Sequence, residues 1–344
     1  METKKLGRQT VRFSDPPAIV GCGSVAGSKE GRGPLGHCFD LTSRDDRFHQ
    51  ESWEKAETTM QKKALSFALN KAGLTTEQLD YVLAGDLLNQ CIATSYSMRT
   101  QEIPFFGLYG ACSTMAEGLS LGAMLIDGGF ASYTAALTSS HFCSAERQYR
   151  NPLEYGGQKP PTAQWTTTGA GAIILSRKGE GPFVTHVTTG KIVDKGITDA
   201  NNMGAAMAPA AAATLLRYLT DTNTQPQEFD AICTGDLGHV GSQLFRELLA
   251  AEGLLLKNHI DCGSLLYDAE GQSVHSGASG PGCCAAVLCG HLLPRLERQG
   301  QRRVLFLATG ALMSQTTFLQ KESIPAISHL VELAAPEEQN GGNT

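Results

Sequence analysis

The chain has 344 residues, of which 41% are hydrophobic and 18% charged, a balance typical of a folded globular protein rather than a disordered one. Its 34 acidic and 28 basic residues give a formal net charge of −6, which argues against a basic face for nucleic acid. No apolar run reaches the roughly 18 residues of a membrane-spanning helix. The N-terminus lacks the apolar segment of a signal peptide, so we expect a cytosolic protein.

Short apolar runs bounded by turn residues predict the strands. These runs are continuous rather than alternating, so we expect strands that are buried on both faces, as in α/β proteins. The predicted strands of the first part are 18–25, 80–85, 105–109, 132–139 and 170–177. Those of the second part are 183–190, 229–234, 303–309 and 315–320.

Longer stretches with helical composition lie between these strands. The predicted helices are 53–73, 89–101, 113–128, 205–221, 242–252 and 283–299. The helix at 113–128 is rich in Ala, Gly and Ser. Such small side chains permit close packing, which fits a helix that lies between two sheets.

Two pairs of segments repeat in the same order along the chain. Residues 80–88 (DYVLAGDLL) match residues 230–238 (DAICTGDLG), and Gly-Asp-Leu ends a predicted strand in each copy. Residues 110–129 match residues 282–300, and an apolar run follows each of them. Two correspondences in one order indicate a duplicated β-α-β-α-β unit.

The duplication divides the chain into an N-terminal half at 1–178 and a C-terminal half at 179–334. The remaining residues, 335–344 (APEEQNGGNT), are polar and predict a disordered tail.

Cys112 is the cysteine most suited to chemistry. The chain has ten cysteines without a CxxC pair or a zinc-binding spacing, so most are expected to be small core residues. The segment YGACSTM places Cys112 between a predicted strand and a predicted helix. Unpaired N–H groups and the helix dipole favour a thiolate there, and Gly110 would allow the sharp turn. Cys112 is therefore a candidate nucleophile for acyl transfer, with a buried structural cysteine as the alternative.

The segment GACSTM, the duplicated halves and the late Gly-rich loop resemble the thiolase and ketoacyl synthase superfamily. One branch is much more similar, the stage V sporulation protein AD family of spore-forming bacteria. The segments that carry this resemblance are GPLGHCFD, ESWEKAE, LAGDLLNQ, FFGLYGACST, GQKPPTAQWTTTGAGA, MAPAAA and TGDLGHVGS. The resemblance implies a thiolase-like α/β fold, with two pseudo-twofold-related halves in a five-layer α-β-α-β-α sandwich.

The family resemblance also implies a function. It implies binding of dipicolinic acid (pyridine-2,6-dicarboxylate) and support of its uptake into the developing spore, together with membrane proteins of the same operon. The expected location is peripheral, at the cytoplasmic face of the forespore or spore inner membrane. A homodimer that forms through the strand at 105–109, or through the neighbouring strand, is also expected.

The catalytic partners of this superfamily are missing from the expected positions. Condensing enzymes combine the cysteine with two His, or with His and Asn, from the second half. This chain has Asp236 at the first position, and the loop 276–284 contains neither His nor Asn. A carboxylate would repel a developing oxyanion, so we expect a degenerate, non-catalytic binding protein. An acyltransferase or condensing enzyme that uses Cys112 is the alternative, and a structural partner with a vestigial pocket is a third reading.

A small aromatic dianion needs cationic or N–H donors and a slot for its ring. The predicted ligand-binding residues are Cys112, His141, Arg147, Lys159, Asp236 and Gly280. A long Pro/Gly-marked loop at 144–165 carries Arg147, Arg150, Tyr155 and Lys159, and Lys159 is expected to supply charge. No resident metal or cofactor is expected. A calcium ion that bridges Asp236 to the dicarboxylate is a further alternative.

Overall fold

The computed structural model describes residues 4–149, 159–298 and 300–336, and its main strands follow one order twice. In the first half the order is β6-β5-β7-β9-β3, and in the second half it is β12-β11-β14-β15-β10. The strands of the first half are β3 (Ala18–Ala26), β5 (Tyr81–Gly85), β6 (Phe105–Gly107), β7 (Tyr133–Ser140) and β9 (Gly169–Ser176). Those of the second are β10 (Phe183–Thr188), β11 (Ala231–Thr234), β12 (His259–Asp261), β14 (Arg303–Ala311) and β15 (Ala326–Ala334).

Strand direction repeats as well. In each half the first three strands of this order pair in parallel. The next two strands each pair antiparallel with the strand before them. The halves meet where Phe183 of β10 pairs with Ala18 of β3. A duplicated unit produces this agreement of order and direction. The predicted boundary between the halves, at 178/179, falls in the connection between β9 and β10.

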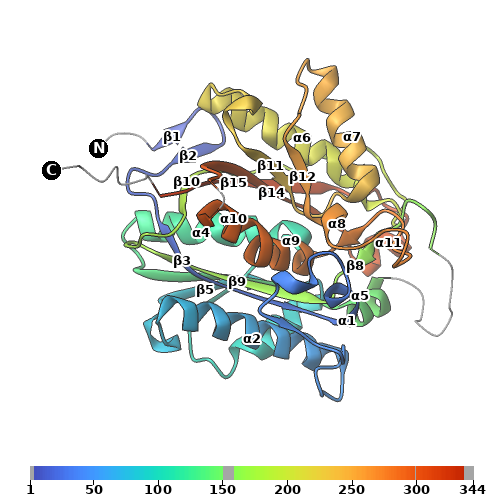
Figure 1. Ribbon diagram of the computed structural model, residues 1–344. Coiled ribbons are helices and arrows are strands. Elements are labelled where there is room, and N and C mark those ends of the chain that lie inside the picture. Colours follow the sequence, from blue (N-terminus) through green and yellow to red (C-terminus); the bar gives the residue numbers. More distant parts are fainter. Residues whose placement is uncertain (1–3, 150–158, 299, 337–344) are drawn as a thin grey trace.

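Three helical layers alternate with the two sheets (Figure 1). Helix α2 (Trp53–Ala72) covers the outer face of the first sheet, and α6 (Met203–Thr222) and α7 (Gly238–Ala251) cover the outer face of the second. The central layer holds α4 (Thr114–Asp127), α9 (Pro281–Val287) and α10 (Leu293–Arg298). The expected five-layer α/β architecture is therefore confirmed. No helix in the described part of the chain has the length and apolar character to cross a bilayer.

The shorter elements complete the described chain. They are β1 (Lys5–Leu6), β2 (Thr10–Arg12), α1 (Ser28–Gly31), β4 (Leu41–Thr42), α3 (Ile92–Met98), α5 (Phe142–Tyr149), β8 (Trp165–Thr166), α8 (Cys262–Leu265), β13 (Ala278–Ser279) and α11 (Gln315–Leu319). The predicted loop 144–165 thus begins in a helix and ends in a strand. Its segment 150–158, with Arg150 and Tyr155, lies outside the described residues, as do residues 337–344 of the predicted tail.

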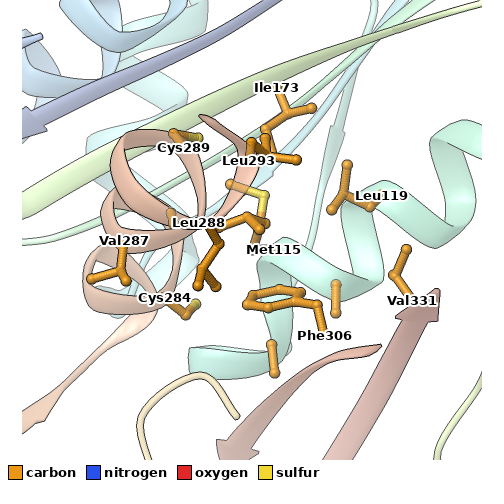
Figure 2. Packing of buried hydrophobic residues seen from close by; sticks show 14 of the residues in the cluster. Met115, Leu119, Ile173, Cys284, Val287, Leu288, Cys289, Leu293, Phe306 and Val331 are labelled. Carbon is orange, nitrogen blue, oxygen red and sulfur yellow. The ribbon is translucent and has the colours of Figure 1, made fainter. Parts of the chain in front are cut away.

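The central layer forms the main hydrophobic core. Figure 2 shows Met115 and Leu119 of α4 between the two sheets, beside Ile173 of β9, Phe306 of β14 and Val331 of β15. All five side chains are fully buried. At roughly 1.5–3 kcal/mol for each large apolar side chain, this layer is a major source of stability.

Small residues allow the central helices to approach the sheets. A Cβ atom added to Gly171 of β9 would lie 2.5 Å from the carbonyl oxygen of Ala285 in α9. Only glycine fits such a contact between strand and helix. The Ala- and Cys-rich composition of α9 has the same cause, because larger side chains would separate the layers.

The predicted strand at 315–320 is wrong. These residues form helix α11 instead, and the Oγ of Ser314 accepts a hydrogen bond from the backbone N–H of Thr317 at its start. A Ser at the N-cap position, with a Thr three residues later, is a common signal for the start of a helix. Here this capping signal outweighs the apolar residues inside the segment.

The last strand, β15, was missed because polar residues interrupt its apolar run. Ser328, His329 and Glu332 are nevertheless buried. Glu332 accepts hydrogen bonds from the Tyr218 hydroxyl at 2.6 Å and from the Arg303 Nε at 2.8 Å. Buried polar groups are tolerated when they are paired in this way, and no local pattern reveals partners that lie so far along the chain.

Candidate functional site

A cavity lies where the Cys112 turn meets the segment before α9. Its inner chamber has a volume of about 80 Å³, and an outer vestibule of about 360 Å³ shares five lining residues with it. Both halves line the inner chamber: Cys112, Glu146 and Thr166 come from the first half, and Met207, Ser279 and Met313 come from the second. A concave site at the junction of two units is a typical position for a small-molecule ligand.

The turn at Cys112 is strained at a different residue from the one the sequence predicts. Ala111 has a φ of 49°, in the left-handed region, whereas Gly110 has an ordinary φ of −82°. Strain of this kind persists only where the surroundings hold the chain in place. The close packing that holds it involves Gly310 of β14, since a Cβ atom there would lie 2.0 Å from the carbonyl oxygen of Gly110.

Cys112 does not have the environment of a thiolate. Burial raises the pKa of its thiol well above the ordinary value, and the neighbouring carboxylate of Asp236 raises it further. Desolvation and the nearby negative charge therefore outweigh the helix start, which was expected to favour ionisation. At neutral pH Cys112 is a protonated, buried thiol in the chamber wall.

Asp236 is a buried carboxyl next to the chamber wall, and its hydrogen bonds and pKa suit a functional group. Its Oδ2 accepts hydrogen bonds from the Gly280 N–H at 2.8 Å and from the Ser279 Oγ at 3.3 Å. Its Oδ1 is buried and has no hydrogen-bond partner of normal geometry in the described chain. Burial raises the pKa of Asp236 to about 7, although the Cys112 thiol and the Gly280 N–H offset part of the rise. Asp236 can therefore hold or release a proton near neutral pH.

Gly280 supports Asp236 instead of facing the cavity with a free donor. Its N–H group is already used by Asp236. Its φ of +106° suits glycine, and an added Cβ atom would lie 2.6 Å from the Oγ of Ser140. The structure thus brings Cys112, Asp236 and Gly280 together, with Gly280 in a positioning role.

Lys159 lies behind the chamber wall. Its Nζ is 2.9 Å from the Oε1 of Glu146, which lines the chamber. The same ammonium is 4.9 Å from the ring centres of Phe142 and Trp165, two rings that stack on each other. Lys159 therefore neutralises Glu146 and fastens the start of the 159–168 segment. Glu146 was not singled out from the sequence, where nothing distinguishes it from other exposed-looking helix residues.

His141 and Arg147 do not reach the chamber. The buried His141 ring donates from Nε2 to the Asp46 carbonyl at 2.8 Å, and its Nδ1 accepts from the Cys143 N–H at 3.1 Å. Burial lowers the pKa of His141, so it is a neutral structural histidine. Arg147 forms an ion pair with Glu54. Among the described residues, no Lys or Arg lines either part of the cavity.

Apolar side chains provide the rest of the wall. Met203 and Met207 from α6 and Met313 after β14 line the chamber. Methionine is flexible and polarisable, and it adapts to flat aromatic ligands. Tyr149 separates the chamber from the vestibule, and its hydroxyl donates to the Leu87 carbonyl at 2.5 Å.

The repeated α/β halves and the cysteine at the β6–α4 turn define a thiolase-like protein. An OleA variant from Xanthomonas campestris shares this fold with a TM-score of 0.60 and 14% identity, over 94% of this chain and 99% of that chain. The 3-oxoacyl-[acyl-carrier-protein] synthase III from Aquifex aeolicus shares it with a TM-score of 0.53 and 13% identity, over 92% and 99%. At these identities the comparisons show the fold alone.

The sequence comparisons are more specific. The family model of stage V sporulation protein AD matches residues 7–334. The stage V sporulation protein AD of Bacillus subtilis (strain 168) is 45% identical over 327 residues, which cover 95% of this chain and 96% of that protein. The chain therefore belongs to the stage V sporulation protein AD family, and its role lies in sporulation.

Proposed function

We propose that the chain binds dipicolinic acid in the cavity between its halves and supports uptake of the acid into the developing spore. The observation that carries the proposal is the cavity between the halves, with a methionine-rich wall and with the Asp236 carboxyl directly behind its lining residue Ser279. Asp236 orients the hydroxyl of Ser279, which can donate to a ligand carboxylate when Asp236 is protonated, and the methionines can pack against the pyridine ring.

The proposed function is non-catalytic. Neither a His nor an Asn lines the inner chamber in the described part of the chain. The Cys112 thiol has a raised pKa, and an ionised Asp236 beside it would oppose a tetrahedral oxyanion. These three features disfavour acyl transfer, which remains the alternative function for the thiolase-like fold.

Calorimetric titration with dipicolinate tests the proposal. We expect binding to the wild-type protein, an affinity at least 10-fold lower in Asp236→Ala, and a modest loss in Cys112→Ala. Lys159→Ala should have an intermediate effect, because Lys159 acts through Glu146. The absence of both heat and a thermal shift at millimolar dipicolinate would remove the proposal.

An acyl-CoA assay tests the alternative. If Cys112 is a nucleophile, the wild-type protein should hydrolyse or transfer an acyl group from acyl-CoA, and Cys112→Ala should abolish this turnover. We expect no turnover by either protein. Turnover that depends on Cys112 would overturn the non-catalytic proposal.

The acidic lining raises the question of which form of the acid is bound. Glu146 faces the chamber and Asp86 faces the vestibule, so a free dianion would meet carboxyl groups. The calcium chelate of the acid carries no such excess of negative charge, and it is the alternative cargo. Among the described residues, no group of three or more potential ligands is arranged to hold a metal ion by itself.

Glu146→Gln distinguishes the two forms of the cargo. Removal of this negative charge should strengthen binding of the free acid but weaken binding of the calcium chelate. The matched control is Glu252→Gln, an exposed position outside both parts of the cavity. Titrations with dipicolinate, with and without equimolar calcium, provide the measurement.

The assembly is also a proposal. β6 is the edge strand of the first half, and it exposes Phe106 (49%) and the nearby Tyr109 (64%). An unpaired apolar edge favours pairing with a second copy, so we propose a homodimer that extends the sheet across β6. We further propose that the protein works with membrane proteins of its operon, bound peripherally at the cytoplasmic face of the forespore or spore inner membrane.

A further inference from the structure

A second cavity lies in the C-terminal half and shares no lining residue with the chamber or the vestibule. Its volume is about 300 Å³. Helix α7, strand β12 and the short helix α8 line this open cavity, in which His239 and Arg246 are exposed, and Figure 1 shows these elements beside one another on one side of the molecule. The carboxyl end of β11 leads into α7, a position where α/β sheets commonly bind ligands.

One wall of this cavity is polar and carries a positive charge. His239, Ser242 and Arg246 follow a spacing of three and four residues, which places them on one face of α7. Arg246 forms no ion pair or hydrogen bond within the described chain. Ser242 is 5% exposed, and its buried Oγ has no hydrogen-bond partner there. A buried hydroxyl without a partner costs free energy, so it is expected to meet a polar group of an occupant.

On the opposite wall, the one carboxyl has its acceptor positions occupied by the protein itself. Asp261 is saturated by five donors, which include the N–H groups of Leu237 and Gly238 at 2.9 and 3.0 Å. Burial lowers the pKa of His259 to about 4, so its imidazole is neutral at physiological pH. Ile260 and Leu265 supply an apolar surface. Among the described residues that line this cavity, Arg246 is thus the cationic side chain whose donors are available to an occupant.

We propose that this cavity binds a small organic oxyanion, a carboxylate or a phosphate attached to an apolar body. The guanidinium of Arg246, the imidazole of His239 and the hydroxyl of Ser242 would contact the oxyanion, and Ile260 and Leu265 would contact the apolar part. Arginine suits this role because its planar group offers several donors to one oxyanion. The inference does not depend on dipicolinate binding at Asp236.

Two probes distinguish the sources of such an oxyanion. Phenyl phosphate joins a phosphate to a flat apolar ring, whereas dipicolinate carries two carboxylates on a similar ring. Each is titrated calorimetrically into the wild-type protein, Arg246→Gln and Ser242→Ala. The matched control is Arg44→Gln, which removes an exposed arginine that lines none of the three cavities.

We expect at least one probe to bind the wild-type protein, and Arg246→Gln to weaken this binding by roughly 10- to 100-fold. Ser242→Ala should weaken it less, and Arg44→Gln should leave it unchanged. If dipicolinate fills both sites, Arg246→Gln should reduce its stoichiometry from two to one; if only phenyl phosphate responds, the cavity is a phosphate site. Binding of neither probe, or binding that Arg246→Gln leaves unchanged, would overturn the proposal.

Discussion

The motif Gly-Asp-Leu ends the same strand in both halves, but its aspartate has a different role in each. In the first half, Asp86 turns back to its own segment, where Oδ1 accepts from the Leu88 N–H and Oδ2 accepts from the N–H and hydroxyl of Thr94. In the second half, Asp236 points to the N–H of Gly280 near the start of α9. Asp86 caps a turn at the vestibule, whereas Asp236 lies behind the Ser279 wall of the inner chamber.

The capping role in the second half has passed to Asp261. This residue accepts hydrogen bonds from the N–H groups of Leu237 and Gly238, at the positions that correspond to Leu87 and Leu88. Because Asp261 satisfies the start of α7, Asp236 is released from local capping. The comparison shows how a duplicated unit can gain a site: a second residue takes over the structural role, and the original residue becomes available.

The largest expected effect of a single substitution is at Asp261. Asp261→Ala leaves three buried N–H groups and two hydroxyls without their acceptor, so we expect a loss of about 3–5 kcal/mol in the free energy of unfolding. Urea denaturation followed by circular dichroism measures it. Asp199→Ala, at an exposed aspartate, is the control. If Asp261→Ala is as stable as the wild-type protein, then Asp261 has not taken over the capping role at the start of α7.

A smaller loss is expected where β14 approaches the Cys112 turn. In Gly310→Ala the new Cβ atom would meet the Gly110 carbonyl oxygen, a backbone atom that cannot move without distorting the turn. We expect a destabilisation of roughly 2–3 kcal/mol and weaker dipicolinate binding. Gly107→Ala is the control, because its Cβ atom would make only ordinary contacts. Equal melting temperatures of the two variants would argue against a tightly held turn.

The repeat and the two-sheet architecture were predictable because they rest on local patterns, such as strand-length apolar runs and the paired Gly-Asp-Leu motifs. The positions of the charged site residues were not. Lys159 and Arg147 were predicted as ligand contacts, yet their nearest partners are Glu146 and Glu54. Ion pairs between separate segments depend on tertiary packing, which no local spacing reveals. Asp261 was missed for a similar reason, since three of its five donors, from Thr234, Leu237 and Gly238, lie on another strand and at the start of another helix.

The different surroundings of Asp236 should also appear in the pH dependence of stability. The pKa of Asp236 is about 7 in the folded protein and 3.8 as an ordinary value, so between these pH values only the unfolded chain ionises. The contribution of Asp236 to the free energy of unfolding of the wild-type protein therefore falls as the pH rises toward 7. Asp236→Asn does not titrate, so its stability relative to wild type should rise by about 2 kcal/mol from pH 5 to pH 7.

Denaturation of both proteins at several pH values measures this difference. It should level off above pH 7, where Asp236 is ionised in both states. A difference that stays constant from pH 5 to pH 8 would show that Asp236 is not a titrating buried carboxyl.

The smallest expected effect on monomer stability is at the edge strand β6 of the first half. Phe106→Asp places a charge on the exposed edge β6, so the proposed homodimer should dissociate with little change in melting temperature. Phe130→Asp is the control, because Phe130 is 73% exposed but lies outside β6. Light scattering at tens of micromolar should give a dimer mass for wild type and for Phe130→Asp. A wild-type monomer would contradict the proposed assembly.

The central claim is that the second aspartate of the pair supports the inner chamber through Ser279, whereas the first caps a turn at the vestibule. The most direct test is the dipicolinate affinity of Asp236→Ala and Asp86→Ala, each measured by calorimetry at a temperature where circular dichroism shows the variant to be folded. We expect Asp236→Ala to lose at least 10-fold in affinity, and Asp86→Ala to change by less than about threefold while it unfolds at a lower temperature. Equal affinity losses in the two variants, or a loss confined to Asp86→Ala, would contradict the account.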